Sequence, residues 1–286
     1  MQRTHDLLNL GEYSPATIRS YLQELRYLFT YYADVRPSQI TYDDTLNYLV
    51  YLNKTHGCSR VKSKMAANAF AFFFKHVQNK PYKIPSILFA AHSSKLPAVM
   101  QVQEMYDVID ALKNVKHKTL ITLLYATGMR ISEIANLKIA DIDSKMMHIK
   151  IVSGKGKKDR FVPLSKLVLN LLRAYYLLYK PVLFLFNGAG RGKKYATRTI
   201  QHVLQHQLAK IGLENKNYTV HTIRHSFATH LVDNGADLQI IQELLGHHHL
   251  SQTTQYLHLS TKRLNQIINP YDAMMSQINI TSNKTT

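Results

Sequence analysis

Apolar residues recur at helical spacing near the start of the chain, which predicts a bundle of helices there. Ser14-Pro15 marks the first helix start, because serine can cap free amides and proline at the first position sacrifices no hydrogen bond. The apolar positions behind it are Ile18, Tyr21, Leu22, Leu25, Leu28, Phe29 and Tyr32. Arg36-Pro37 ends this helix, and further helices are predicted at about residues 41–56 and 59–77.

The third of these helices is rich in phenylalanine and begins with the basic residues Arg60, Lys62 and Lys64. We interpret its aromatic side chains as core, since the aromatic surfaces on which nucleic-acid bases stack usually lie on sheets. The three basic residues at its start are better candidates for contact with phosphate.

A stretch with little periodicity, residues 80–99, follows the helices and is interrupted by prolines. These prolines are Pro81, Pro85 and Pro97. Such a composition is typical of a linker. We therefore predict a first domain at residues 1–90 and a second at residues 98–286.

The second domain is predicted to be mostly helical with a small antiparallel β-sheet. Helical spacing predicts helices at about residues 101–112, 117–126, 131–137, 165–179, 197–211, 221–234, 237–245, 251–257 and 262–268. Residues 147–152 and 160–163 have the pattern of two strands that a Lys-Gly turn joins into a hairpin. The fold class that follows is mainly α.

The chain is strongly basic, with 36 lysines and arginines against 18 aspartates and glutamates and a formal net charge of +18. Such an excess favours a polyanionic partner, because each cation that meets a nucleic-acid phosphate releases a condensed counterion. On charge alone, a generally basic protein without such a partner remains the alternative.

Cysteine content and hydropathy bear on the compartment. Cys58 is the single cysteine, which excludes an internal disulfide and a cysteine-based metal cage and fits a reducing environment. Residues 1–10 are polar and lack the apolar block of a signal peptide. The apolar stretch at 175–186 is too short to cross a bilayer. We therefore expect a cytoplasmic protein with no membrane partner.

Candidate chemistry is densest between His221 and Tyr256. His221 and Arg224 lie three residues apart on a predicted helix, so both side chains leave the same face. Burying this pair without an anion would cost several kcal/mol, so the pair requires a phosphate or a carboxylate. Gly246 ends the next helix and places His247 on an exposed turn, from which a short segment leads to Tyr256.

A metal site is the natural alternative in a chain with 15 histidines. His221 and His225 have the spacing of zinc-binding helices, but Thr222 stands where the metalloprotease pattern needs a glutamate. The run 247–249 cannot direct three adjacent histidines at one ion without unusual backbone. We expect no metal and no other cofactor.

Two further cations precede this cluster along the chain. Lys155 lies in the predicted hairpin turn, which lacks the residue order of a phosphate-binding loop. It is either a point donor to a neighbouring site or part of a solvated basic turn. Arg130 starts a predicted helix with Glu133 three residues on. This pair is either a surface salt bridge of little value or, with Arg224, a second bidentate donor to one phosphodiester.

These residues, in this order, resemble the signature of the tyrosine recombinases, also called the phage integrase family. The elements are Arg130-x-x-Glu133, Lys155 on a hairpin, His221-x-x-Arg224, Leu245-Gly246-His247 and Tyr256. The run His221-Thr-Ile-Arg-His-Ser-Phe-Ala-Thr-His-Leu is similar to the Xer side of the family. Ser14-Pro-x-Thr17-x-x-x-Tyr21-x-x-x-Leu25 resembles the helical core-binding domain that precedes the catalytic domain in these enzymes. The resemblance covers nearly the whole chain.

The resemblance implies a reaction without metal or ATP. Tyr256 would attack a DNA phosphate to give a 3′-phosphotyrosine and a free 5′-hydroxyl. Arg130 and Arg224 would stabilise the pentacoordinate transition state, His247 would add a hydrogen bond and Glu133 would support the site. Lys155 would protonate the departing 5′-oxygen, and His221 would help to deprotonate the tyrosine.

The resemblance also implies a fold and partners. Residues 1–90 would be a SAM-like core-binding domain and residues 98–286 a catalytic domain with the DNA breaking-rejoining fold. Such enzymes bind double-stranded DNA as homo-tetramers on two DNA sites. Residues 263–268 are the candidate segment to pack into a neighbouring subunit, with docking on their own domain as the alternative. Lys157 is a further candidate DNA contact, and could take the place of Lys155.

Some features depart from the family pattern. His248 and His249 replace the small or acidic pair usual after the signature histidine, and Gln255 and Leu257 give Tyr256 atypical neighbours.

The rival functions are relaxation of DNA by a type IB topoisomerase, which shares this site, and a catalytically silent DNA-binding relative. A metal-dependent transposase would need three convergent carboxylates, and the sequence offers no such set.

Overall fold

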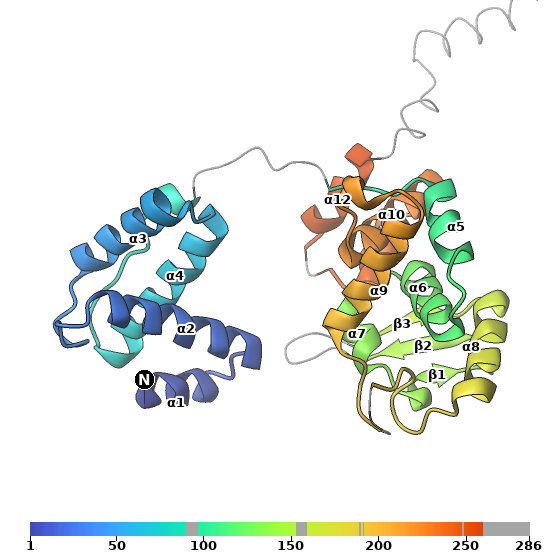
Figure 1. The fold of residues 1–286 in the computed structure, drawn as a ribbon, viewed down its shortest axis with the longest axis horizontal. Coiled ribbons are helices and arrows are strands. Elements are labelled where there is room, and N and C mark those ends of the chain that lie inside the picture. The colour runs from blue at the N-terminus through green and yellow to red at the C-terminus, as the bar shows by residue number, and fades with distance from the viewer. Residues whose placement is uncertain (90–96, 153–158, 189, 191, 248, 260–286) are drawn as a thin grey trace, which may run out of the picture. The chain divides into compact units, whose positions relative to one another are not determined.

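The structure is a computed structural model that describes residues 1–89, 97–152, 159–188, 190, 192–247 and 249–259 (Figure 1). The chain separates into two compact units, Met1–Ser94 and Lys95–Thr286. Each unit has its own hydrophobic core. Within the described residues, helices dominate both units and the strands form one small antiparallel sheet, so the predicted fold class is confirmed.

Side-chain caps fix the starts of three helices of the first unit. The helices of this unit are α1 (Gln2–Leu10), α2 (Pro15–Tyr31), α3 (Tyr42–His56) and α4 (Arg60–Phe72), followed by a π-helical turn (Phe73–Val77) and a 3-10 turn (Ser86–Phe89). The hydroxyl of Ser14 accepts the backbone N–H of Thr17 at 3.1 Å, as the sequence predicts. The prediction did not include α1, because only Thr4 and Leu8 of its residues are buried and the apolar pattern is too sparse.

The core of the first unit lies where α4 packs against α2 and α3. Leu25 and Leu28 of α2 and Phe70 of α4 are fully buried there. Phe73 and Phe74 of the π-helical turn join the same cluster. The phenylalanines at this end of the unit therefore form core, as interpreted from the sequence.

The second unit combines helices with three short strands. Its helices are α5 (Val102–Asp110), α6 (Val115–Thr127), α7 (Ile131–Asn136), α8 (Lys166–Tyr179), α9 (Thr197–Lys210), α10 (Val220–Asp233), α11 (Leu238–Leu245) and α12 (Ser251–Leu259). Its strands are β1 (Ile142–Asp143), β2 (His148–Ile151) and β3 (Arg160–Pro163). The sequence predicted β2 and β3 but missed β1, which is too short to show an alternating pattern.

The sheet has the order β1-β2-β3, with both pairs antiparallel. Ile149 is paired with Ile142 on one side and with Val162 on the other. Side chains alternate along β3, so Arg160 and Val162 point inward while Phe161 is exposed. An arginine thus occupies an inward position at the start of a strand.

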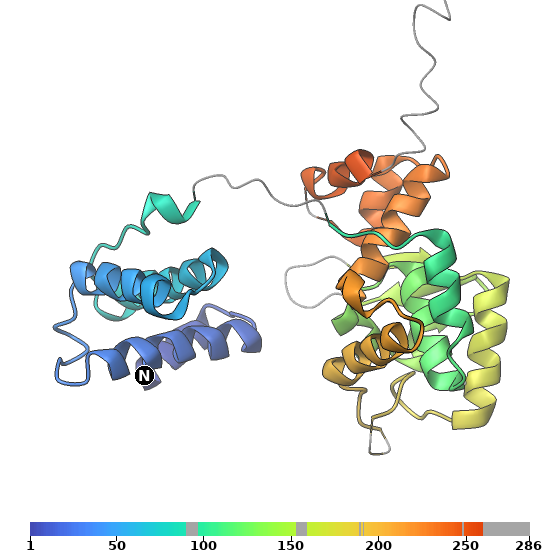
Figure 2. The same cartoon turned by 45° about the horizontal axis from the view of Figure 1, so that its top comes forward.

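Helix α6 is the centre of the second unit and packs against α5, α7, α8 and α10 (Figure 2). Leu120, Ile121, Leu123 and Leu124 on its different sides are all buried, which only a helix surrounded by other elements can achieve. Helices α10, α11 and α12 form a separate small core against one another.

Two glycines end helices beside this second core. Gly128 ends α6 at φ +60°, and a Cβ there would lie 2.4 Å from the ring of Phe227. Gly246 ends α11 at φ +61°, and a Cβ there would lie 3.1 Å from Cδ of Arg160. Both turns therefore need glycine for backbone conformation and for close packing.

Candidate functional site

Three arginines meet the last carbonyl groups of α11. The final carbonyls of a helix have no partner within it and carry the negative end of the helix dipole, so cations are favoured there. Each arginine takes a different carbonyl. The pairs are Arg160 Nε with Leu244 O at 2.6 Å, Arg224 Nη2 with Leu245 O at 2.6 Å, and Arg130 Nη2 with Gly246 O at 3.2 Å.

Glu133 holds two of these arginines from one carboxylate. Its Oε1 and Oε2 accept from Arg160 Nη1 at 3.0 Å and Nη2 at 2.8 Å, a bidentate fork. The backbone N–H of Arg130 donates to Oε2 at 2.7 Å and its Nη1 to Oε1 at 2.8 Å. Burial opposes ionisation of Glu133, but the hydrogen bonds from Arg160 and Arg130 prevail and lower its pKa to about 2.

Arg160 is the residue of this network that sequence reasoning missed. Its side chain is 8% exposed and links β3, the start of α7 and the end of α11. The available signal was its inward position on a strand, since a buried arginine requires a carboxylate partner. The partner, Glu133, is 27 residues away in the sequence, so the pairing was not visible there.

Arg224 is the most deeply buried cation of the predicted set, at 5% exposure. Its Nη1 donates to Gly128 O at 2.6 Å, so it joins the ends of α6 and α11. Burial, with the charge of Arg130 nearby, lowers its pKa to about 10. It therefore remains a cation at neutral pH, in a setting that favours an anion.

His247 follows the α11 end directly. Its Nδ1 lies 2.9 Å from the hydroxyl of Thr253, and its ring is nearly parallel to that of Tyr256, with 6.2 Å between the centroids. Burial first, and then the charges of Arg224 and Arg130, lower its pKa to about 4. The imidazole is therefore neutral at physiological pH.

Tyr256 lies on α12 with 1% of its surface exposed. It belongs to the small core that contains Ala228 and Leu245. Burial raises the pKa of the phenol above its ordinary value, although Arg224 and a hydrogen bond from Gln255 act in the opposite direction. The phenol is therefore protonated in this state.

The phenol oxygen of Tyr256 lies 3.1 Å from Nδ1 of His225, a contact that the sequence did not indicate. His225 follows Arg224 directly, and adjacent residues on a helix point in different directions, so nothing in the spacing placed it beside the tyrosine. His221, predicted to act on the tyrosine, has an exposed side chain at the start of α10. Among the described hydrogen bonds, none joins His221 to Tyr256.

The remaining predicted site residues divide into two groups. Lys155 and Lys157 lie outside the described residues, between the end of β2 and the start of β3. At the start of α4, Arg60 donates to Ile87 O at 2.9 Å. Lys62 pairs with the buried carboxylate of Glu24 and lies over the ring of Tyr27. Lys64 is exposed.

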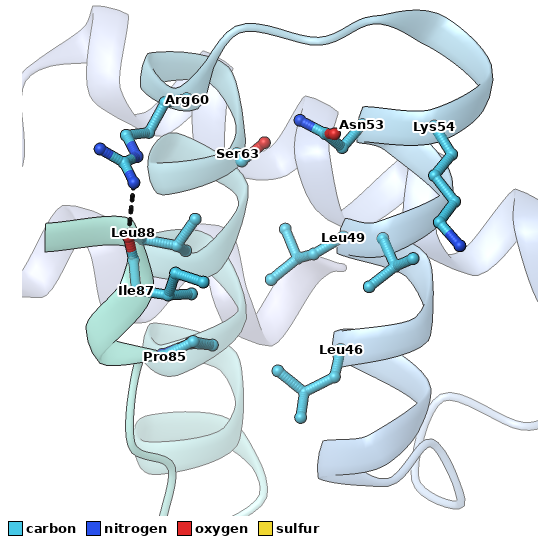
Figure 3. Close-up of a pocket in the computed structure, with 10 residues that line it drawn as sticks. Leu46, Leu49, Asn53, Lys54, Arg60, Ser63, Pro85, Ile87 and Leu88 are labelled. Atoms are coloured by element: carbon cyan, nitrogen blue, oxygen red, sulfur yellow. Dashed lines mark hydrogen bonds between the residues drawn. The ribbon is translucent and has the colours of Figure 1, made fainter. Parts of the chain in front are cut away.

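The first unit contains an apolar hollow. That hollow has a volume of about 450 Å³ and lies between α3, α4 and the 3-10 turn (Figure 3). Its lining residues are Leu46, Leu49, Val50, Asn53, Lys54, Arg60, Ser63, Pro85, Ile87 and Leu88. None of the residues predicted to act in catalysis belongs to it.

The described residues contain neither a membrane-spanning helix nor a cluster of metal ligands. No helix there is both long and apolar enough to cross a membrane. In the same part of the chain, no three histidine, cysteine or carboxylate side chains converge as metal ligands would.

The site thus combines three guanidinium groups, one carboxylate that both orients and partly neutralises them, a neutral histidine and a protonated tyrosine. Surplus positive charge favours an anion, and fixed forks suit the non-bridging oxygens of a phosphate. A mainly α fold that carries such an anion-binding site beside a tyrosine is the arrangement expected of the tyrosine recombinases.

Comparison with known proteins agrees with this class. Residues 98–263 match the model of the phage integrase family, and residues 1–84 match that of the phage integrase N-terminal SAM-like domain. The chain therefore belongs to the phage integrase family of tyrosine recombinases, and it is a site-specific recombinase.

Individual relatives cover most of the chain. Tyrosine recombinase XerD of Staphylococcus saprophyticus is 30% identical over 276 residues, which are 90% of this chain and 92% of XerD. Tyrosine recombinase XerA of Pyrococcus horikoshii is 34% identical over 232 residues, 79% of this chain and 78% of XerA. The resemblance to the Xer side of the family is thereby confirmed.

Solved structures show the same fold. XerH bound to its palindromic difH substrate, in a post-cleavage complex, gives a TM-score of 0.68 at 25% identity, over 87% of this chain and 78% of XerH. A lambda integrase dimer bound to a COC′ core site gives a TM-score of 0.69 at 16% identity, over 94% of this chain and 78% of that one.

Proposed function

We propose that this recombinase cuts and rejoins double-stranded DNA through a 3′-phosphotyrosine at Tyr256, without metal or ATP. The observation that carries the proposal is the convergence of Arg130, Arg224 and His247 around the end of α11, beside the tyrosine. Relatives solved on DNA, such as XerH on difH, support a DNA substrate.

In the proposed reaction the phenol oxygen attacks phosphorus and the bond to the 5′-oxygen breaks. Arg130 and Arg224 neutralise the charge that develops on the non-bridging oxygens, which is the largest contribution that fixed donors can make. His247 adds a neutral hydrogen-bond donor. Glu133 orients the arginines. Since the covalent link preserves the energy of the phosphodiester, a new 5′-hydroxyl can attack it in the reverse direction.

Two proton transfers complete the proposed step. Lys155 protonates the departing 5′-oxygen, as the family pattern implies, with Lys157 as the neighbouring candidate for this role. A histidine of α10 takes the proton of Tyr256, which the family pattern assigns to His221.

We further propose that both units bind the same DNA, through residues 1–90 and 98–286, and that four copies assemble on two DNA sites. The structure of a lambda integrase dimer on DNA supports association in general. Residues 263–268 are our candidate for the contact between subunits. Arg60, Lys62, Lys64 and Lys157 are proposed as phosphate contacts.

The proposal is tested with a duplex that the full-length chain selects from a pool of random double-stranded sequences. A nick placed close to the cleavage position lets a short fragment diffuse away after attack, so that the covalent intermediate accumulates. Wild type should form a denaturation-resistant adduct with this duplex, and Tyr256→Phe should form none. If wild type forms no adduct, or Tyr256→Phe still forms one, the proposed chemistry is wrong.

The outcome of cleavage is tested separately. A plasmid with two copies of the selected duplex should yield exchange products, whereas a topoisomerase would only relax it. Relaxation without exchange would contradict the proposal.

A further inference from the structure

The tyrosine nucleophile contacts a histidine to which the family pattern assigns no role in the reaction. Nδ1 of His225 lies 3.1 Å from the phenol oxygen of Tyr256, with 5.7 Å between the two ring centroids. We infer that His225, in place of His221, accepts the phenolic proton of Tyr256 when the tyrosine attacks DNA. This inference rests on the proposed function and names the group that performs one of its proton transfers.

The protonation states make His225 an acceptor. Burial first, and then His221 and Arg224, lower the pKa of His225 to about 4, so its ring is neutral and one nitrogen carries a lone pair. Burial keeps Tyr256 protonated, and Gln255 hydrogen-bonds the phenol in the sense that lowers its pKa, as a donor does. The phenolic proton is then directed at Nδ1 of His225, and the remaining ring proton is on Nε2.

The surroundings of His225 link its basicity to the arrival of DNA. The charged and titratable groups near it are His221 and Arg224 on α10, His247 after α11 and Tyr256 on α12. Of these groups, Arg224 is the cation, and its charge opposes protonation of His225 in the free protein. A bound phosphate adds negative charge to this cluster, so the pKa of His225 rises towards its ordinary value. The tyrosine is thus activated only when substrate is present.

The proposed step is balanced in atoms and charge. The O–H bond of Tyr256 breaks and its proton forms a bond with Nδ1 of His225, which becomes an imidazolium. The phenol oxygen bonds to phosphorus, the bond from phosphorus to the 5′-oxygen breaks, and that oxygen takes a separate proton from Lys155. On rejoining, each transfer runs in reverse and His225 returns its proton to Tyr256.

The test compares His225→Asn with His230→Asn in the full-length chain. His230 is a matched control because it lies on the same helix and its Nδ1 makes the same kind of contact, 2.7 Å from the hydroxyl of Tyr125. On the selected nicked duplex, His225→Asn should form adduct about 100-fold more slowly, the usual loss on removing a general base. His230→Asn should keep the wild-type rate and pH profile, and both variants should bind the duplex as wild type does.

The pH profile separates a base from a structural group. The rate of His225→Asn should increase with pH well beyond the point where wild type levels off, because the tyrosine must then ionise to solvent. Added imidazole should restore part of the rate. A duplex with a 5′-thiol leaving group, which needs no acid, should rescue Lys155→Ala but leave the defect of His225→Asn unchanged.

A measurement on the wild-type protein tests the inference even if His225→Asn does not fold. Nitrogen NMR of the labelled histidine ring should show the proton on Nε2 and an unprotonated Nδ1. A proton on Nδ1, or a His225→Asn rate and pH profile equal to wild type, overturns this inference. If wild type forms adduct and Tyr256→Phe does not, those results leave the proposed function intact, so the two failures are distinguishable.

Discussion

Each unit of the molecule buries one glutamate against cations, but the two arrangements differ. In the first unit, Glu24 meets the single ammonium of Lys62, and its Oε2 is buried without a hydrogen-bond partner among the described residues. In the second unit, both oxygens of Glu133 are held by the fork of Arg160 and by Arg130. Lysine supplies a point charge on a flexible stem, whereas arginine also fixes an orientation.

The two ion pairs, at Glu24 and at Glu133, therefore have different roles in the protein. A single ammonium neutralises Glu24 and so allows α2 and α4 to pack, but it sets no geometry beyond the pair. The fork on Glu133 holds Arg160, Arg130 and the end of α11 in one arrangement, next to the residues proposed to bind phosphate. We therefore expect the Lys62 pair to matter for stability and the Arg160 pair for the rate of reaction.

The largest effect is expected for Arg160→Lys. Lysine keeps the charge but loses the fork, so Glu133 and Arg130 shift, and a misplacement of about 1 Å near the chemistry lowers a rate about 100-fold. The rate of adduct formation at saturating DNA measures this effect. The matched control is Lys62→Arg, which keeps the charge at the other pair and should change that rate little. If Arg160→Lys and Lys62→Arg slowed adduct formation equally, the proposed difference between the two ion pairs would be contradicted.

Lys62→Met is expected to destabilise the protein by about 2 kcal/mol, because it leaves Glu24 buried without a cation. This loss of stability is smaller than the loss expected for a fully buried ion pair, because the lysine side chain is 38% exposed. Urea denaturation of the full chain measures the change. Adding Glu24→Gln to Lys62→Met should recover part of the loss. If Lys62→Met bound DNA more weakly but was as stable as wild type, Lys62 would act only as a DNA contact.

Gly246→Ala and Gly57→Ala compare two helix ends with positive φ. A Cβ at Gly57 meets nothing within 4 Å, so alanine there should cost only backbone strain, about 1 kcal/mol. A Cβ at Gly246 meets Arg160 at 3.1 Å, so we expect a similar loss of stability together with slower adduct formation. Thermal unfolding and the adduct assay measure the two effects. A rate loss in Gly57→Ala as large as in Gly246→Ala would contradict the assignment.

The smallest effect concerns pH. The folded pKa of His247 is about 4 against an ordinary value of 6.5, so the unfolded chain binds more protons between these values and stability falls as pH decreases through them. Glu133, with a pKa of about 2, loses its contribution only at still lower pH. His247→Asn should therefore reduce the dependence of Tm on pH between neutral and mildly acidic buffer, while His225, whose pKa is also lowered to about 4, keeps part of it. An unchanged slope would contradict the stated protonation of His247.

The sequence predicted most helices because their signals are local. Ser14 and Thr41 cap helices through neighbouring residues, and Gly246 ends one by its own backbone conformation. Strand β1 and helix α1 were missed because two paired residues and two buried residues leave too little pattern.

Only the site residues that belong to short sequence motifs could be predicted from the sequence. Arg130, Arg224, His247 and Tyr256 were identified from short motifs, and the structure brings them together. Arg160 and His225 were not, because their partners Glu133 and Tyr256 are 27 and 31 residues away and meet them only after folding.

The most direct test of the central claim is to identify the bond between protein and DNA. Wild type is trapped on the selected nicked duplex, digested with protease, and the DNA-linked peptide is sequenced by mass spectrometry. The account predicts one linkage, from the phenol oxygen of Tyr256 to the 3′-phosphate of the cleaved strand, with a free 5′-hydroxyl on the released fragment. A linkage through another residue, or to a 5′-phosphate, would contradict it.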